Sequence, residues 1–296
     1  MPNDDTRQDR AKKDQAKKDQ AKKSDADREK TLSPSGKLIV ERHGPVTRLT
    51  LNRPEVHNCL DRELSQELHD AVRAVNIDRG CRVVVLTGAG DTFCAGDDIK
   101  EFQTWTKEDP PWQVRLYQET VRILENLAPT SVALVDGVCT GGGLELTLAS
   151  DFVIATKRSR WGMPEINWDI TPGWGGTGKI AKFAGRRKAL EWNLLGTLFS
   201  GEKAARYDLA NRVVDHQHLE DEGRKLVEIL LSKESVTTVC TKFCVKKGAD
   251  AHIDSVMNFE GAPQRAQFVD NPGIKDFAET ETRNKRRALL KDFWFD

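Results

Sequence analysis

The chain has 296 residues, of which 38% are apolar and 31% charged, and its 46 basic residues balance 46 acidic ones. This length is enough for one large domain or two small ones. Because the net charge is zero, nothing in the overall balance indicates a nucleic acid or an anionic membrane as a partner, and no apolar run reaches the ~18 residues that a membrane-spanning helix needs.

The cysteines and histidines give no sign of a metal site. The six cysteines form no CxxC pair, and no histidine cluster has the spacing of metal ligands. We therefore expect reduced, mostly buried thiols and no metal. With no signal peptide in the sequence, these thiols predict a cytoplasmic protein.

Residues 1–33 differ in composition from the rest of the chain. They repeat Ala-Lys-Lys-Asp-Gln at 11–15 and 16–20 and contain almost no large apolar side chains. Such a segment buries too little surface to offset the entropy of ordering it, so we expect a disordered tail. The alternative is a basic arm that binds RNA or a partner protein, but the interleaved aspartates cancel most of its charge.

The folded part is expected to begin at Gly36. Residues 38–41 and 46–51 predict two short strands across a Gly-Pro turn, and 61–77 predict a helix with apolar residues at helical spacing. Residues 83–86 form a continuous apolar run, which is typical of a strand buried on both faces. A glycine turn at 87–91 ends that strand.

The second half of the chain continues this alternation. A helix at 112–127, a strand at 131–135, a helix opened by three glycines and a strand at 152–155 together predict an α/β core. After about Asp215 the pattern is helical, and the aromatic end at 293–295 would gain from docking on a partner subunit. We expect a core over 34–225 and a helical C-terminal region over 226–296.

Two glycine turns follow strands. Gly141, Gly142 and Gly143 lie between a strand and a helix, where free backbone N–H groups and the helix dipole bind negative charge. Ala95-Gly96-Asp97 supplies a similar turn earlier in the chain. Either turn alone is weak evidence, but the two in this order and with these neighbours indicate a site for a developing oxyanion.

Several spaced motifs, in this order, resemble those of the crotonase (enoyl-CoA hydratase/isomerase) superfamily. The resemblance spans roughly 38–247. It is carried by Asn-Arg-Pro-Glu at 52–55, Phe-Cys-Ala-Gly-Asp-Asp-Ile-Lys-Glu at 93–101, Gly-Gly-Gly-Leu-Glu-Leu at 141–146, Asp151, Trp-Gly-Met-Pro-Glu at 161–165, Pro-Gly-Trp-Gly-Gly-Thr at 172–177 and the segment 200–214.

The resemblance implies a fold and an assembly. The fold would be an α/β spiral of ββα units with a C-terminal helical trimerisation region, forming a homotrimer or a hexamer made of two trimers. The substrate would be an acyl-CoA, with coenzyme A as part of the substrate and no further cofactor. Neither a membrane nor a nucleic acid is an expected partner.

It also implies the residues of the site. The backbone N–H groups of Asp97 and Gly142 would form the oxyanion hole around the thioester carbonyl, and Glu145 and Glu165 would be the acid and base of a hydratase. We assign Glu145 to positioning and deprotonating water and Glu165 to proton donation at C2. The expected substrate-binding residues are Ala95, Gly96, Asp98, Ile99, Gly141, Trp168, Gly173 and Trp174, with Gly173 beside the water.

The chemistry of hydration agrees with two carboxyls beside N–H donors. Addition of water across C2=C3 of an enoyl thioester places negative charge on the thioester oxygen, which such donors stabilise. Neighbouring carboxyls push their pKa values apart, so one accepts a proton while the other donates. The structural alternatives are that Glu145 only complements a helix dipole and that Glu165 is a loop residue. We expect the Asp97 side chain to point away from the enolate and Asp98 to cap a turn.

The tryptophans bear on which acyl group the site would bind. Trp161, Trp168 and Trp174 flank Glu165 in sequence, and Trp105 and Trp112 follow the first glycine turn. Core packing is expected for Trp161, whereas the others suggest a pocket for a bulky or ring-bearing acyl group. Residues 166–168 also resemble the hydroxycinnamoyl-CoA hydratase-lyases. Basic residues at 283–287 are candidates, as a group, for the coenzyme A phosphates.

Three functions remain open from the sequence. Hydration of an enoyl-CoA is the first, because both glutamates are present. Isomerisation of the double bond, or hydrolysis of a thioester or C–C bond, would use the same site. A non-catalytic scaffold that binds RNA or a protein through residues 1–33 is the third, and it would bind RNA with a strong dependence on salt.

Overall fold

The computed structural model describes residues 28–270 and 284–290 of the chain. A seven-stranded sheet runs through its centre in the order β1-β2-β3-β4-β5-β7-β10. These strands are β1 (Arg28–Leu32), β2 (Leu38–His43), β3 (Val46–Leu51), β4 (Val83–Gly88), β5 (Thr130–Val135), β7 (Phe152–Thr156) and β10 (Arg212–Val214).

The sheet changes from antiparallel to parallel at β3. The pairs β1–β2 and β2–β3 are antiparallel, whereas β3–β4, β4–β5, β5–β7 and β7–β10 are parallel. Residues 83–87 of β4 and every residue of β5 are buried, as their apolar runs predict for strands covered on both faces. The helices that cover the two faces therefore complete the core.

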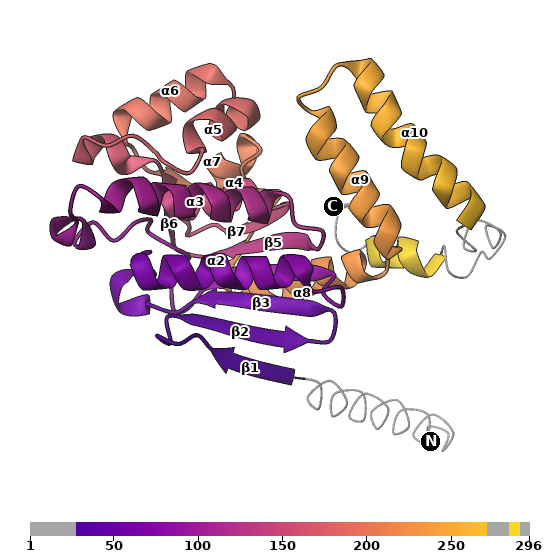
Figure 1. The fold of residues 1–296 in the computed structure, drawn as a ribbon, viewed down its shortest axis with the longest axis horizontal. Helices are drawn as coiled ribbons and strands as arrows, with labels where there is room; N and C mark the ends of the chain where they lie inside the picture. The colour runs from indigo at the N-terminus through magenta and orange to yellow at the C-terminus, as the bar shows by residue number, and fades with distance from the viewer. Residues whose placement is uncertain (1–27, 271–283, 291–296) are drawn as a thin grey trace, which may run out of the picture.

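Helices α2 (Arg62–Ile77) and α3 (Asp109–Glu125) lie along one face of the sheet, and α8 (Leu219–Leu231) lies on the other (Figure 1). The predicted apolar face of α2 is buried, with Leu64, Leu68, Val72 and Val75 in the larger core cluster. A second cluster joins the β4, β5 and β7 side chains of the opposite face to α8. The central sheet thus separates two apolar layers.

A smaller sheet holds the residues that matter for chemistry. It consists of β6 (Val138–Thr140), β8 (Arg160–Gly162) and β9 (Phe199–Ser200), with β6 and β8 parallel. The buried helix α4 (Gly142–Ala149) follows β6, and the short helix η3 (Pro164–Trp168) follows β8. Because the carboxyl ends of parallel strands meet at one edge of a sheet, the residues after β6 and after β8 are neighbours.

The remaining elements surround this centre. They are η1 (Pro54–Val56), η2 (Glu101–Thr104), α5 (Gly176–Ala184), α6 (Arg186–Leu195), α7 (Gly201–Arg206) and η4 (His216–His218). Two longer helices, α9 (Ser235–Gly248) and α10 (Ile253–Asp270), pack on each other and stand apart from the sheets (Figure 1). Within the described residues, no helix combines the length and apolar character needed to cross a membrane.

Three sequence-based boundaries need correction. Residues 28–32, assigned to the disordered tail, form β1, whose pairing with β2 depends on backbone hydrogen bonds rather than on apolar side chains. The expected domain boundary at residue 226 falls inside α8, whose Leu226 and Ile229 belong to the core. The helix expected from residue 112 begins at Asp109, with two prolines in its first turn. Residues 1–27 and the aromatic end at 293–295 lie outside the described residues.

Candidate active site

The two glycine turns lie against each other. Backbone bridges join Leu60 to Asp97 and Cys94 to Cys139. Gly96 has φ +96°, and a methyl group built on it would lie 3.0 Å from the Thr140 carbonyl oxygen and 3.2 Å from the Gly142 nitrogen. Only glycine adopts this conformation and admits this approach without strain. The close approach places the N–H groups of the two turns in one small region.

Two backbone N–H groups in this region have no protein acceptor. Around them the turns are tightly bonded, since Leu60 N–H donates to the Gly96 carbonyl at 2.9 Å and Gly141 N–H donates to the Gly162 carbonyl at 3.0 Å. Within the part of the chain that the structure describes, no hydrogen bond uses the N–H of Asp97 or of Gly142. Both donors are therefore free for a ligand oxygen, and Gly142 also begins α4, where the helix dipole favours negative charge.

The carboxyls of Glu145 and Glu165 reach this region from two neighbouring elements. Glu145 is in the first turn of α4, after β6, and Glu165 is in η3, after β8. A methyl group on Gly141 would lie 3.2 Å from Glu165 Oε1, and one on Gly176 would lie 2.9 Å from Glu145 Oε1. The structure thus brings together four residues that the sequence analysis assigned to the chemistry, namely Asp97, Gly142, Glu145 and Glu165.

Glu145 is buried, with 1% of its surface exposed, and its Oε1 accepts two backbone hydrogen bonds. Trp174 N–H donates at 2.8 Å and Gly176 N–H at 2.7 Å. The pKa of Glu145 is raised to about 8, mainly by burial and also by the charges of Glu165 and Asp97, while the two N–H donors oppose the shift. Glu145 is therefore a fixed carboxyl that exchanges a proton near neutral pH.

Glu165 is a second buried carboxyl with an open position. Its Oε2 is buried without a hydrogen-bond partner in the described part of the chain, and burial raises its pKa. A carboxyl with a raised pKa and a free oxygen is suited to proton donation. The pair can therefore share one proton, in which case its pKa values belong to the pair rather than to either glutamate.

The Asp97 side chain corrects an expectation. Its carboxyl does not point away from the site but lies beside the Tyr117 hydroxyl and the Trp174 N–H, with Oδ1 buried and close enough to Glu165 for their charges to interact. The pKa of Asp97 is raised to about 7, mainly by burial and also by the charge of Glu165, while the nearby Tyr117 hydroxyl and Trp174 N–H oppose the shift. A raised pKa favours the neutral carboxyl, and a neutral carboxyl removes the charge repulsion on which the expectation rested.

Trp174 forms a wall of the site. Its ring stacks on Tyr117 with centroids 4.2 Å apart, and a methyl group on Gly142 would lie 3.2 Å from its Cζ2 atom. Beside it, a methyl group on Gly173 would meet no atom within 4 Å. The ring therefore covers the start of α4, while open space lies next to Gly173, where a water molecule was expected.

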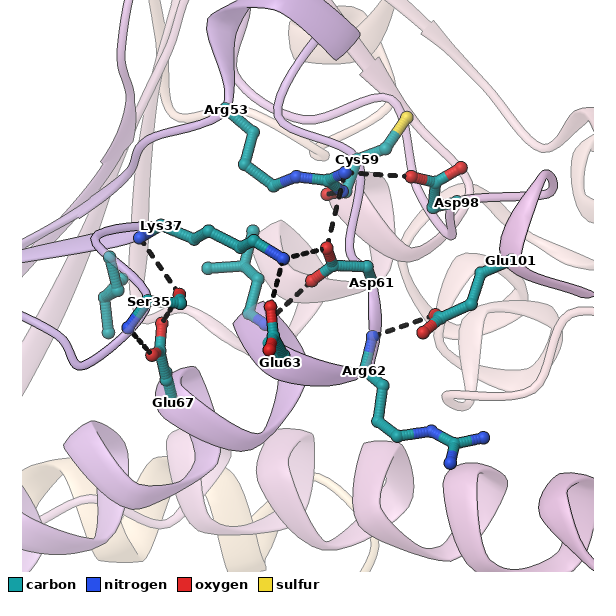
Figure 2. A network of polar contacts seen from close by, with 12 residues as sticks. Ser35, Lys37, Arg53, Cys59, Asp61, Arg62, Glu63, Glu67, Asp98 and Glu101 are labelled. Atoms are coloured by element: carbon teal, nitrogen blue, oxygen red, sulfur yellow. Dashed lines mark hydrogen bonds and ion pairs between the residues drawn. The ribbon is translucent and has the colours of Figure 1, made fainter. Parts of the chain in front are cut away.

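A network of ion pairs holds the first glycine turn in place (Figure 2). Arg53 Nη2 lies 3.0 Å from Asp98 and 3.3 Å from Asp61, and Arg53 Nη1 donates to the Cys59 carbonyl at 2.6 Å. Asp98 Oδ1 also accepts from Lys100 N–H at 3.2 Å, which is the turn-capping role expected of it. The network thus ties the turn that carries the Asp97 N–H to the start of α2.

Other predicted residues lie away from the two carboxyls. Trp168, 57% exposed, and Ile99 are on the surface of the single chain, whereas Trp161 is fully buried and donates to Ser159 Oγ at 2.8 Å, as expected for a core residue. Arg286 influences Lys233 electrostatically, and Leu290 packs on the α8 side of the sheet. The described part of the basic group, residues 284–287, therefore lies near α8 and not among the residues placed around the two carboxyls.

One cluster outside the site has the spacing of metal ligands. Asp91, Asp136 and His216 hold their ligand atoms within 4.8 Å of one another. However, Arg158 donates to Asp136 Oδ1 at 2.7 Å and to Asp91 Oδ1 at 2.8 Å. The guanidinium already supplies the positive charge there, so the cluster is a surface ion-pair network.

The sequence analysis missed Tyr117 and Gln113. Both are buried, and they lie one turn apart on α3. Two polar residues at helical spacing among the apolar positions of α3 were the available signal, because buried polar side chains are uncommon without a partner.

Comparisons with known proteins agree with this geometry. The sequence profile of the family described as enoyl-CoA hydratase/isomerase matches residues 41–285. The crotonyl-CoA hydratase of Syntrophomonas wolfei is 32% identical over 224 residues, which is 75% of this chain and 86% of that protein. The hydroxycinnamoyl-CoA hydratase-lyase of Pseudomonas fluorescens is 30% identical over 260 residues, covering 80% of this chain and 93% of that protein.

Among solved structures, an enoyl-CoA hydratase from Bacillus anthracis superimposes with a TM-score of 0.79. It is 29% identical, and the match covers 83% of this chain and 97% of that one. The crotonase fold expected from the sequence motifs is therefore confirmed.

Proposed function

Since the chain belongs to the enoyl-CoA hydratase/isomerase family, we propose that it is an enoyl-CoA hydratase, adding water across the C2=C3 double bond of an enoyl-CoA. The observation that carries this proposal is the meeting of two unpaired backbone N–H groups with two buried carboxyls. The N–H donors without an acceptor can stabilise a thioester oxygen that gains negative charge, and the carboxyls can transfer protons.

The thioester oxygen would lie between the N–H groups of Asp97 and Gly142. As water attacks C3, the electrons of the double bond move to give an enolate, and its charge collects on this oxygen. Donors held in place before the reaction favour that charge by about 3 kcal/mol each. The close packing of Gly96 on Gly142 fixes the two donors relative to each other.

Glu145 and Glu165 would divide the proton transfers. The Glu145 carboxylate takes a proton from the water in the open space near Gly173, and the oxygen bonds to C3. The Glu165 carboxyl gives its proton to C2, and the enolate reverts to a thioester. Both glutamates exchange protons with solvent before the next turnover. The active form thus carries one proton on the pair, which the raised pKa values support.

The reaction balances with the enoyl-CoA and water alone, giving a 3-hydroxyacyl-CoA. It therefore calls for no metal or redox cofactor, and coenzyme A enters as part of the substrate. All six cysteines are unpaired thiols, which is typical of proteins in reducing compartments and supports a cytoplasmic location.

A homotrimer, or a hexamer of two trimers, is the proposed assembly. Apolar side chains of α9 and α10 are exposed although these helices stand apart from the sheets (Figure 1). They are Val236, Val239, Phe243, Val245, Ile253, Met257, Phe268 and Val269. An apolar surface of this kind is stabilised by burial against another chain. A molar mass three or six times that of the chain, measured by light scattering, is the expected result.

Isomerisation of the double bond is the second candidate. The observation that favours it is the Trp174 ring, which covers Gly142 and gives that side of the site an apolar surface. An isomerase needs the same enolate but moves a proton from C4 to C2 without taking up water. Hydrolysis of a thioester or C–C bond is a further alternative in the same site.

The test is a panel of short, long and aromatic enoyl-CoAs followed by absorbance of the conjugated thioester, with mass analysis of the products. We expect a 3-hydroxyacyl-CoA, and a 10²–10⁴-fold loss of kcat in Glu145→Gln and in Glu165→Gln, the range for a general acid or base. A double bond that moves without uptake of water would identify an isomerase. Turnover that survives both substitutions would contradict the assigned roles.

A further inference from the structure

A group of buried polar atoms beside the carboxyl pair has no hydrogen-bond partner within the described part of the chain. It comprises Asp97 Oδ1, Tyr117 Oη, Trp174 Nε1, both polar atoms of Gln113 and Ser65 Oγ. The proposed hydration uses none of these atoms. A buried polar atom without a partner is unfavourable, so a group of them indicates a missing ligand or water.

These atoms belong to one connected wall. Tyr117 stacks on Trp174, and the charge of Asp97 adds to burial in raising the pKa of Tyr117. Gln113 and Ser65 also lie beside the Tyr117 hydroxyl, and they lower its pKa where Asp97 raises it. The Asp97 carboxyl, the Tyr117 hydroxyl and the Trp174 indole N–H thus face one another, although no pair of them forms a well-aligned hydrogen bond.

The wall borders the reacting centre. A methyl group on Gly142 would lie 3.3 Å from Trp174 Cε2, the ring carbon bonded to Nε1. Asp97 is the residue whose backbone N–H is the other proposed oxyanion donor. Its carboxyl is close enough to Glu165 for their charges to interact. An acyl chain that runs from the thioester oxygen past Glu165 therefore meets the polar wall within a few carbon atoms.

The hydrogen-bond donors and acceptors of the wall indicate which chemical group of a ligand it would bind. A carboxylate or carbonyl oxygen of Asp97 accepts a hydrogen bond, whereas Tyr117 and Trp174 donate. A hydroxyl group both donates and accepts, so one hydroxyl satisfies all three side chains. An alkyl chain satisfies none of them. An ammonium group only donates, so it cannot accept from Tyr117 and Trp174. A carboxylate on the acyl group would be buried next to three acidic side chains.

We propose that the acyl pocket binds a short enoyl-CoA bearing a hydroxyl group beyond the double bond, with this hydroxyl held by Asp97, Tyr117 and Trp174. This inference rests on the proposed function, whose substrate class it narrows. The Tyr117 and Trp174 rings stack on each other beside Gly142, which favours a compact acyl group. Ordered water in place of the hydroxyl is the competing occupant.

The experiment compares matched substrates that differ by one oxygen. The value of kcat/KM is measured for crotonyl-CoA against 4-hydroxybut-2-enoyl-CoA, and for pent-2-enoyl-CoA against 5-hydroxypent-2-enoyl-CoA. We expect the wild type to prefer one hydroxylated member by about tenfold or more, because a site built around a hydroxyl discriminates against the analogue without it. Equal rates, or preference for the plain chains, would overturn the proposal and indicate water in the pocket.

Two variants test the named side chains. Tyr117→Phe removes only the hydroxyl, and Asp97→Asn keeps the backbone N–H and the shape of the side chain. Each is expected to bring the preference ratio close to one. The matched control is Tyr207→Phe, since Tyr207 is the only other tyrosine of the chain and packs edge-on against Trp192 in a separate aromatic cluster. A preference that survives both substitutions would contradict the assignment.

A binding measurement separates this proposal from the proposed function. The affinities of the saturated butyryl-CoA and 4-hydroxybutyryl-CoA are measured by calorimetry, which needs no turnover. Tighter binding of the hydroxylated thioester, lost in Tyr117→Phe, supports the polar pocket even if no enoyl-CoA is hydrated. Equal affinities, with hydration of plain enoyl-CoAs intact, would remove the pocket proposal and leave the hydratase proposal standing.

Discussion

Replacement of Glu145 by Gln is expected to lower the activity strongly and to stabilise the fold. Glu145 is buried and has a pKa raised to about 8 from an ordinary value of 4.5. Between these two values the folded chain holds a proton that the unfolded chain has lost, so stability falls as the pH rises through this range. The amide of Gln has no charge, and its oxygen still accepts the N–H groups of Trp174 and Gly176.

The size of the effect follows from the two pKa values. At pH 7 the unfolded side chain is fully ionised and the folded one is mostly protonated. At about 1.4 kcal/mol per pH unit, Glu145 then destabilises the fold by about 3 kcal/mol relative to a neutral side chain. We expect the unfolding free energy of Glu145→Gln to exceed that of the wild type by about this amount at pH 7, and by little near pH 4.5, where the folded side chain is protonated and the unfolded one only half ionised.

Urea unfolding at equal protein concentration, at pH 5 and at pH 7, measures the difference. The control is Glu55→Gln, an exposed glutamate whose replacement should change the unfolding free energy by less than about 0.5 kcal/mol at both pH values. The reasoning on burial and protonation would be refuted if the stability advantage of Glu145→Gln over the wild type were no larger at pH 7 than at pH 5.

Three further predictions concern the turns, the ion-pair network and the pH profile. Gly96→Ala places a methyl group at φ +96° and 3.0 Å from the neighbouring turn, so kcat/KM should fall by about 100-fold and stability by about 2 kcal/mol; wild-type kinetics would contradict this. Arg53→Ala removes the cation that pairs with Asp98 and leaves Asp61 paired with Lys37 alone; since the arginine side chain is only 13% exposed, the unfolding free energy should fall by about 2 kcal/mol. Arg115→Ala, which is 81% exposed, should lower it by less than about 0.5 kcal/mol, and equal losses in the two variants would count against the network. Finally, kcat/KM should decrease as the pH falls below about 8, since protonated Glu145 cannot accept a proton from water, and a flat profile from about pH 6 to pH 9 would exclude it as the base.

Local patterns predicted the elements that depend on apolar burial. The spacing of Leu64, Leu68 and Val72 gives α2 its buried face, and the unbroken apolar runs give β4 and β5 their central places. Strand β1 was missed because its sequence, Arg-Glu-Lys-Thr-Leu, has little to bury, and its pairing with β2 is made by the backbone. Composition therefore predicts the core more surely than it predicts an edge strand.

Only part of the site could be predicted from the sequence. The motifs around Gly142, Glu145 and Glu165 identified residues that the structure brings together, although 20 positions separate the two glutamates, because β6 and β8 are parallel. The orientation of the Asp97 side chain was predicted wrongly. Its surroundings come from α3 and from the loop before α5, and no local pattern around Asp97 reports on residues so distant in the sequence.

The most direct test of the account is incubation of the protein with crotonyl-CoA in water labelled with heavy oxygen, followed by mass analysis of the product. The account predicts 3-hydroxybutyryl-CoA with one labelled oxygen at C3, formed rapidly by the wild type and at least about 100-fold more slowly by Glu145→Gln. An unlabelled product in which the double bond has moved, or labelled product formed equally fast by the variant, would contradict it.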